Sequence, residues 1–397
     1  MGIEYPIISA AMTWVTSAEF VAAVSNAGGM GVLGPNAGQT EKATSAEDMA
    51  DRLTQEIRKV KALTNKPFAV NYIFPMGGAT EDPFTNAVFD VLVKENVKNV
   101  IAIGLNVVDR ELKRLKEQDI KVVYRDLSPT VEKLVEAEKS GVDALIVTGY
   151  EAGGHMSDYK ISTFSLVPQI TSLVKIPVIA AGGIIDGRGA KAALSMGAEG
   201  VYMGTRFIVT KENPASMETK KAIIKVKSEE FIEFKSGTGH LRTIPTEAGK
   251  KALELINLGK PAEAYKYYGE GFKIGMLDGD LVNGTVSVSE SAGGIQQILT
   301  CQEVIDEIVK PSDEDLKIFF LQFDTDQIRI NLIQPGPIQT NIVTKALSEK
   351  AIEERAQQVP IKRLGQSQEV ANLALFLASD EASYITGAHH ELMEDCL

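Results

Sequence analysis

Cysteine, histidine and tryptophan are scarce in this chain, which holds only 2, 4 and 1 of them among its 397 residues. The two cysteines, Cys301 and Cys396, are too few and too far apart to build a disulfide framework or a zinc cluster. The four histidines are scattered along the sequence as well. We therefore expect neither a metal site nor a disulfide scaffold.

Long hydrophobic runs are absent too. The apolar stretch Ile176–Ile185 is broken by Pro177 and Gly182–Gly183, and it falls well short of the roughly 18 residues that a membrane-spanning helix needs. The N-terminus, Met1–Ile8, has no basic region and carries an acidic residue and a proline, so it does not resemble a signal peptide. These two absences predict a cytoplasmic protein.

Positive charge is in deficit, because 41 Lys and Arg face 53 Asp and Glu, which gives a formal net charge of −12. An acidic surface repels nucleic-acid phosphates and anionic lipid headgroups, so we expect neither a nucleic-acid nor a membrane partner. The apolar share of 44% and the charged share of 24% are typical of a globular protein. The length allows two or three domains at about 150 residues each.

The first 210 residues alternate regularly between strand-like and helix-like segments. Eight short apolar runs, rich in β-branched residues, lie at Tyr5–Met12, Gly29–Gly34, Pro67–Ile73, Val97–Gly104, Ile120–Asp126, Ala144–Gly149, Pro177–Ile184 and Gly200–Phe207. Stretches of helical period separate them, at Ser17–Ala27, Ala46–Leu63, Pro83–Glu95, Asp109–Gln118, Pro129–Lys139, Ser165–Val174 and Gly187–Met196. Eight strand–helix units predict an α/β fold, a closed (β/α)8 TIM barrel. The rival is an open doubly wound sheet, which usually begins with a glycine-rich turn, whereas the first turn here, Ala10–Trp14, has no glycine.

The rest of the chain divides into three further segments. Residues 211–311 contain helical stretches that end in a glycine-dense run, Gly275–Gly294, and we expect them to form a helical lid and to complete the barrel of residues 1–210. Residues 312–326 begin with the polar, acidic sequence Ser312–Asp315 and are predicted to be a linker. Residues 327–397 then form a C-terminal fragment.

Glycines at the ends of the last two strands predict a phosphate site. Strand seven ends in Gly182–Gly183, and strand eight ends in Met203–Gly204–Thr205. In (β/α)8 barrels the loops after these two strands often hold a phosphate group with backbone N–H donors. Glycine lets the backbone approach an anion closely, and the Thr205 hydroxyl adds a donor. Each pair alone is equally typical of a tight turn, but the two together favour a phosphorylated cofactor.

A histidine follows the sixth strand. His155 comes after Gly153–Gly154 at the carboxyl end of the barrel, where the chemistry of such barrels takes place. Its side chain can act as a general acid or base, or as a neutral hydrogen-bond donor. The alternative is a loop histidine that caps a helix or faces solvent. The neighbouring glycines favour the catalytic interpretation.

Positions 1 to about 300 resemble the FMN-dependent nitronate monooxygenases (the 2-nitropropane dioxygenase family) and the related flavin-dependent enoyl-ACP reductases II. The motifs that carry the resemblance are Pro6–Val15, Ala22–Gly31, Pro67–Asn71, Glu151–His155, Ala180–Gly183 and Met203–Phe207. The chain departs from many nitronate monooxygenases at Thr148, where they have glutamine. The resemblance implies an FMN-binding barrel and an FMN-dependent oxidoreductase.

The resemblance also implies roles for individual residues. Ala11 and Met12 are expected to lie against the isoalloxazine ring, Asn71 to bond the flavin or its ribityl chain, and Gly153 to contact the flavin. The phosphate would be held by Gly182, Gly183, Met203, Gly204 and Thr205. His155 aligns with the active-site histidine of the family. No Lys or Arg for the N1 edge of the flavin can be identified from the sequence.

The last seventy residues resemble a different family. Residues 327–388, with Ile328–Thr340 and Phe376–Gly387, are similar to the C-terminal third of the short-chain dehydrogenases/reductases, including ketoacyl-ACP reductases. The glycine-rich dinucleotide turn and the Tyr-x-x-x-Lys pair of that family are both missing. The segment is therefore expected to be an incomplete fragment without catalytic or cofactor motifs, whose apolar run 328–333 needs a covering surface.

Three functions remain open at this point. The first is oxidation of an alkyl nitronate with O2 through a flavin intermediate, with His155 at the nitro group. The second is an enoyl-ACP reductase II, which uses NAD(P)H and an acyl-ACP substrate. The third is a flavin-binding scaffold whose tail docks a partner, which an intact His155 and a complete phosphate site disfavour. The sequence alone does not identify the substrate or the reductant, and it is compatible with a homodimer.

Overall fold

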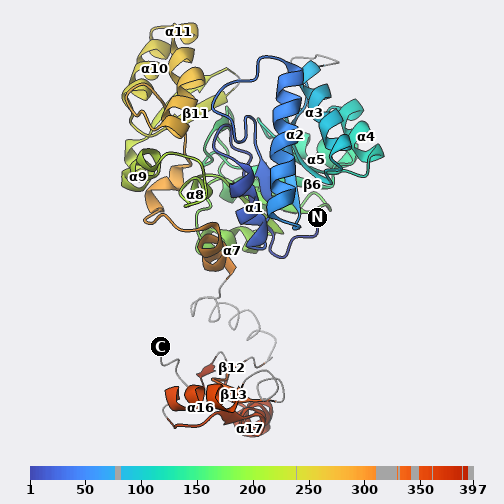
Figure 1. Ribbon diagram of the computed structural model, residues 1–397, viewed down its shortest axis with the longest axis vertical. Coiled ribbons are helices and arrows are strands. Elements are labelled where there is room, and N and C mark those ends of the chain that lie inside the picture. Colours follow the sequence, from blue (N-terminus) through green and yellow to red (C-terminus); the bar gives the residue numbers. More distant parts are fainter. Residues whose placement is uncertain are drawn as a thin grey trace. The chain divides into compact units, whose positions relative to one another are not determined.

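The computed structural model describes residues 1–76, 82–237, 239–309, 329, 331–340, 348–359, 361–386 and 388–391. The chain separates into two compact units, Met1–Val309 and Lys310–Leu397 (Figure 1). The predicted linker, residues 312–326, lies outside the described residues. Within the described residues, none of the helices combines the length and the apolar character needed to span a membrane.

Eight parallel strands form the centre of the first unit, in the order β1-β9-β8-β6-β5-β4-β3-β2. Their bounds are β1 Ile7–Ser9, β2 Gly31–Leu33, β3 Phe68–Ile73, β4 Asn99–Gly104, β5 Lys121–Asp126, β6 Ala144–Thr148, β8 Val178–Ala181 and β9 Gly200–Met203. A parallel bridge between Ile8 and Met30, beside β2, joins the two ends of this order. The ring is therefore closed, and the predicted (β/α)8 barrel is confirmed over the open doubly wound sheet.

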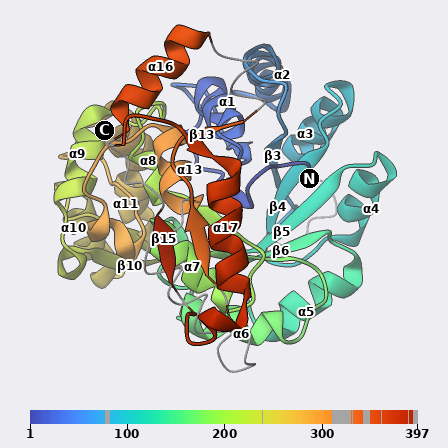
Figure 2. The same ribbon diagram turned by 90° about the horizontal axis from the view of Figure 1, so that it is seen from below.

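Helices cover the outside of this barrel, and Figure 2 shows α3, α4 and α5 beyond β3 to β6. They are α1 Ala18–Asn26, α2 Ala46–Leu63, α3 Pro83–Lys94, α4 Asp109–Glu117, α5 Val131–Ser140, α6 Thr163–Thr171 and α7 Gly187–Ser195. Most begin at a capping side chain; Ser45 Oγ, for example, accepts the N–H of Asp48. Inward-facing strand residues such as Val32, Ile101 and Ile146 fill the barrel, and a second apolar layer lies between strands and helices.

The lid follows β9 and is not purely helical. It contains α8 Thr205–Ile208, α9 Met217–Lys225, α10 Glu247–Asn257, α11 Pro261–Tyr265 and α12 Gly271–Lys273, with π-helical turns at Lys266–Glu270 and Ile274–Asp278. A hairpin, β10 Ile232–Ser236 and β11 Gly239–Thr243, was not predicted from the sequence. It pairs with the short strand β7, His155–Ser157, so the lid is bonded to the segment that carries the candidate histidine.

The last helix of the first unit returns to the barrel. Helix α13, Cys301–Val309, packs against α1 and α7 and so occupies the place of the eighth outer helix. Cys301, Val304 and Ile305 are buried in the same apolar layer as the helices on either side. The lid is therefore an insertion between the eighth barrel strand and the eighth barrel helix.

In the second unit, the described residues contain two small parallel strand pairs and two α-helices. Strand β12, Leu332–Gln334, pairs with β15, His389–Glu391, and β13, Ile338–Gln339, pairs with β14, Gly365–Gln366. The helices are α16, Glu349–Gln358, and α17, Ser367–Ala378. Arg329 ties β12 to the end of α17 by donating to the carbonyls of Leu377 at 2.6 Å and Ala382 at 2.8 Å.

Candidate active site

A cavity of about 310 Å³ lies at the carboxyl ends of the barrel strands. This volume falls at the lower end of the range typical of small-molecule sites. All ten residues predicted for the site line it, namely Ala11, Met12, Asn71, Gly153, His155, Gly182, Gly183, Met203, Gly204 and Thr205. They come from five strand ends and are brought together because parallel strands end on one face of a barrel.

The glycine turn after β8 forms one end of the cavity. Gly182 and Gly183 have φ of 97° and 78°, a conformation that side chains other than glycine rarely adopt. A Cβ atom on Gly182 would lie 2.8 Å from the carbonyl oxygen of Gly149. The turn therefore requires glycine, and it presents bare backbone next to Gly204 and Thr205 at the end of β9.

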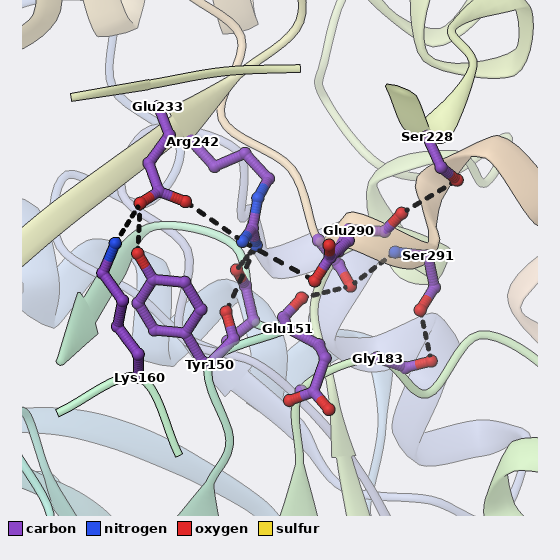
Figure 3. A network of polar contacts seen from close by, with 12 residues as sticks. Tyr150, Glu151, Lys160, Gly183, Ser228, Glu233, Arg242, Glu290 and Ser291 are labelled. Carbon is purple, nitrogen blue, oxygen red and sulfur yellow. Dashed lines mark hydrogen bonds and ion pairs between the residues drawn. The ribbon is translucent and has the colours of Figure 1, made fainter. Parts of the chain in front are cut away.

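The lid closes this end of the cavity through hydrogen bonds of Ser289 and Ser291, and Figure 3 shows the bond between Ser291 and Gly183. The N–H of Ser289 donates to Thr205 Oγ1 at 2.8 Å, and its own hydroxyl donates to the carbonyl of Glu151 at 2.8 Å. Ser291 Oγ donates to the carbonyl of Gly183 at 2.7 Å. Because Thr205 Oγ1 acts as an acceptor here, its hydrogen is left to donate to a ligand.

A second group of contacts fastens the lid hairpin to the loop before His155 (Figure 3). Arg242 on β11 is only 3% exposed, and it donates to the carbonyls of Tyr150 at 3.2 Å and Ala152 at 3.0 Å. Its guanidinium also lies 3.4 Å from one carboxylate oxygen of Glu233, and the other oxygen of Glu233 accepts a hydrogen bond from the Tyr150 hydroxyl. These contacts hold the loop, and with it His155, in one position under the lid.

His155 lines the cavity, and its Nε2 lies beneath the lid strand β11 beside Gly239. Its Nε2 is buried and has no hydrogen-bond partner among the described residues. Burial lowers the pKa of His155, and the positive charge of Arg125 lowers it further, while a hydrogen bond to the Leu127 backbone acts in the opposite direction. A bond that favours the protonated ring is one in which the ring donates, so Nδ1 carries the hydrogen of the neutral ring and Nε2 keeps its lone pair. The site therefore holds a neutral imidazole that can accept a proton.

Arg125 supplies the positive charge of the cavity. It follows the buried part of β5, and its Nε donates to Thr148 Oγ1 at 3.1 Å while its guanidinium reaches the carbonyl of His155 at 3.4 Å. Burial lowers its pKa, yet an arginine stays protonated at neutral pH. Within the described residues it makes no ion pair with a carboxylate. Its charge is thus available to an anionic ligand.

The residues present fit a flavin mononucleotide. Ala11 and Met12 provide an apolar wall, and Gly183 and Thr205 lie at a bare-backbone, hydroxyl-bearing end suited to one phosphate. Arg125 is a cation of the kind that tunes the electron-accepting ring of a flavin. Asn71 is 8% exposed and donates to the carbonyl of Ile101 at 3.0 Å, which leaves its side-chain oxygen as an acceptor.

Several lining residues escaped the sequence analysis. Arg125 is the next-to-last residue of β5 and has no motif around it, so only its place near the carboxyl end of the fifth strand could have suggested a role. Tyr202 points into the barrel and accepts the N–H of Ala11 at 2.7 Å. Ser287 accepts the N–H of Gly154 at 2.9 Å, and Ser289 binds Thr205. These serines lie 84 to 138 residues from their partners, and no local pattern could have connected them.

The family model described as nitronate monooxygenase matches residues 1–311. The chain belongs to this family. A probable nitronate monooxygenase of Staphylococcus aureus (strain MRSA252) is 34% identical over 279 residues, which is 61% of this chain and 75% of that protein. A probable nitronate monooxygenase of Staphylococcus saprophyticus is 35% identical over 277 residues, 60% of this chain and 75% of the relative.

Solved structures agree with the family and the barrel. FabK from Thermotoga maritima is 31% identical, with a TM-score of 0.69, and the match covers 82% of this chain and 96% of that chain. A nitroalkane oxidase from Streptomyces ansochromogenes is 23% identical, with a TM-score of 0.65 and coverage of 77% and 95%, which supports the fold alone. The chain is thus a flavin-dependent oxidoreductase of the nitronate monooxygenase family.

The C-terminal segment matches a separate family model. The model described as enoyl-(acyl carrier protein) reductase, a short-chain reductase family, covers residues 320–392. This match confirms the predicted resemblance of the tail to part of a short-chain reductase.

Proposed function

We propose that the protein is an FMN-dependent enzyme that oxidises alkyl nitronates with O2 as the electron acceptor. The observation that carries the proposal is the pair of Arg125 and His155 in one cavity. A cation that makes no ion pair with a carboxylate among the described residues suits a nitronate, which is an anion, and a neutral imidazole beside it suits proton transfer.

In this proposal, different residues of the cavity bind the cofactor and the substrate. Flavin, when bound, supplies the electron-transfer chemistry, and the protein supplies orientation and electrostatics. Gly182, Gly183, Gly204 and Thr205 hold the phosphate end. The guanidinium of Arg125 attracts the negative charge of the nitronate.

His155 extends the same activity to neutral nitroalkanes. We assign to His155 the uptake of the proton from the carbon next to the nitro group, which converts the neutral compound into the anion that Arg125 binds. A positioned base of this kind contributes about 10²–10⁴-fold in rate. The lid hairpin covers the imidazole, since a Cβ atom on Gly239 would lie 2.7 Å from Nε2.

A second candidate function has its own support. FabK is an enoyl-ACP reductase II, and the Thermotoga maritima protein is 31% identical over most of this chain. In that function NAD(P)H is the reductant, an acyl-ACP is the substrate, and His155 lies near the thioester carbonyl. The experiment must therefore separate the two donors of electrons.

The test is anaerobic mixing of the purified holoenzyme with one electron donor at a time. We expect propyl-1-nitronate to bleach the flavin absorbance and NADH and NADPH to leave it unchanged, with oxygen consumption on admission of air. Free FMN at the same concentration is the control. Bleaching by NADH or NADPH but not by the nitronate would reject nitronate oxidation in favour of enoyl reduction.

A further inference from the structure

A second cavity lies beside the first, at the ends of β2 and β3 and next to helices α2 and α3. Its volume is about 330 Å³. The two cavities share three lining residues, Pro35, Asn71 and Ile73, so they meet along one ridge at the rim of the barrel. Neither Arg125 nor the Gly182–Gly183 turn lines the second cavity. It is therefore adjacent to the proposed flavin and charge site without being part of it.

The lining of the second cavity is mainly apolar. Six of its side chains, from β2, β3, α2, α3 and the loop after β2, are Leu33, Ala37, Met49, Leu53, Val70 and Val88. Its polar side chains are largely engaged locally. Arg52 donates to Asp48 at 2.6 Å and to the carbonyl of Glu41 at 2.9 Å, and Asp82 caps α3 through the N–H of Phe84. These bonds leave a space that favours a hydrocarbon over a polar ligand.

Large apolar side chains are exposed where the two cavities open. Ile73, which lines both, is 40% exposed, Met76 at the first cavity is 45% exposed, and Phe84 at the second is 45% exposed. Apolar side chains that gather at a concave surface in this way mark a ligand site more often than a random surface. Because Ile73 belongs to both linings, these side chains lie around the boundary between the two cavities.

We propose that the second cavity holds the alkyl chain of the substrate while its reacting end lies at Arg125 and His155. The proposal rests on the proposed function for the identity of that reacting end. A short chain fits the first cavity alone, whereas a longer straight chain crosses the ridge at Asn71 and Ile73. Each methylene buried beyond the ridge is expected to tighten binding about fourfold, until the second cavity is full.

The test measures binding and turnover separately on the holoenzyme. Straight-chain carboxylates from propionate to decanoate are unreactive mimics of the nitronate, with the same planar pair of oxygens, and their Kd values come from calorimetric titration. Primary alkyl nitronates from three to eight carbons give kcat/KM. We expect the Kd of the carboxylates and the kcat/KM of the nitronates to change little among the shortest members. For longer members, Kd should fall and kcat/KM should rise by about fourfold per methylene.

Variants assign the effect to the second cavity. Ala43→Phe, at a half-buried lining position, should abolish the improvement with chain length while leaving the three-carbon ligands within about twofold. Ala262→Phe, the same change at an exposed position of α11, is the matched control and should keep it. Met49→Ala should enlarge the second cavity, so Kd and kcat/KM should keep improving up to a longer chain than in the parent. This variant tests the cavity even if Ala43→Phe does not fold.

Two different failures can be told apart. Chain-dependent carboxylate binding that Ala43→Phe removes would support the cavity even in an enzyme that oxidises no nitronate, in which case only the proposed reaction is rejected. Nitronate oxidation with equal Kd values along the carboxylate series, or with the same slope in parent and Ala43→Phe, would overturn the chain-binding proposal and leave the reaction standing.

Discussion

Replacing Arg125 by methionine removes the positive charge of the cavity and keeps the length of the side chain. At a separation of about 4 Å and an effective dielectric constant of about 20, two unit charges interact by about 4 kcal/mol. Arg125 is half-buried and already donates to Thr148, so the net loss lies nearer the 1.5–3 kcal/mol typical of a hydrogen bond to a charged group. We expect kcat/KM for propyl-1-nitronate to fall about 10- to 150-fold.

Initial rates of oxygen consumption by flavin-loaded protein measure this loss. Arg125→Lys, which keeps the charge, should recover most of the activity. Arg58→Met, which removes an exposed arginine paired with Glu95 on the outside of the barrel, is the matched control and should change kcat/KM by less than about twofold. An Arg125→Met enzyme within twofold of the parent would refute the electrostatic argument.

The same variant has a second, independent signature in the pH profile. The positive charge of Arg125 helps to hold the pKa of His155 below its usual value, so the histidine stays neutral and active down to a lower pH. Without that charge the pKa of His155 rises, and the acid limb of kcat/KM for a neutral nitroalkane should move to higher pH. An unchanged acid limb would show that another group controls it.

Four further changes test the remaining parts of the site. His155→Ala should retain FMN and lose about 10²–10⁴-fold in turnover of neutral nitroalkanes, and a kcat within twofold of the parent would exclude a catalytic role. Gly183→Asp should yield protein without flavin by absorbance, whereas Gly141→Asp, at a positive-φ glycine with open space around it, should keep flavin. Gly239→Ala should displace the imidazole and lower kcat at unchanged flavin content. Truncation after Pro311 should leave flavin content and activity within about twofold, since the barrel and lid form one compact unit, and loss of either in a folded protein would give the tail a part in the site.

The barrel could be predicted from the sequence because each of its strands and helices is recognisable from its own short segment. Each strand is a short apolar run, and helix α2 begins at Ala46 and ends at Leu63, as its periodicity predicts. The hairpin of β10 and β11 was missed because its strands are short: Ile232–Ser236 alternates apolar and polar residues over only five positions, and Gly239–Thr243 has a single large apolar side chain, Leu241. Pairing with β7 stabilises it, and that partner lies more than 70 residues away.

In the candidate site, too, some residues could be predicted from local sequence and others only from long-range contacts. Gly182 and Gly183 could be recognised from the sequence, because a pair of glycines after a strand indicates a turn with positive φ, a conformation that other residues rarely adopt. Arg125 and Ser289 acquire their meaning only through contacts with Thr148 and Thr205, which depend on the closed ring and on the returning lid. Charge and hydroxyl groups of this kind cannot be told from ordinary surface residues before the fold is known.

The lid leaves the barrel and rejoins it at nearly the same place. Thr210 and Leu299 form a parallel bridge, and the N–H of Lys211 donates to the carbonyl of Leu299 at 2.8 Å. An insertion whose ends are already adjacent adds little loop-closure cost, so its length can vary without opening the barrel. Lids from relatives could therefore be transplanted between these two points to change which substrates are admitted, provided that each graft retains a counterpart of Ser289 for Thr205.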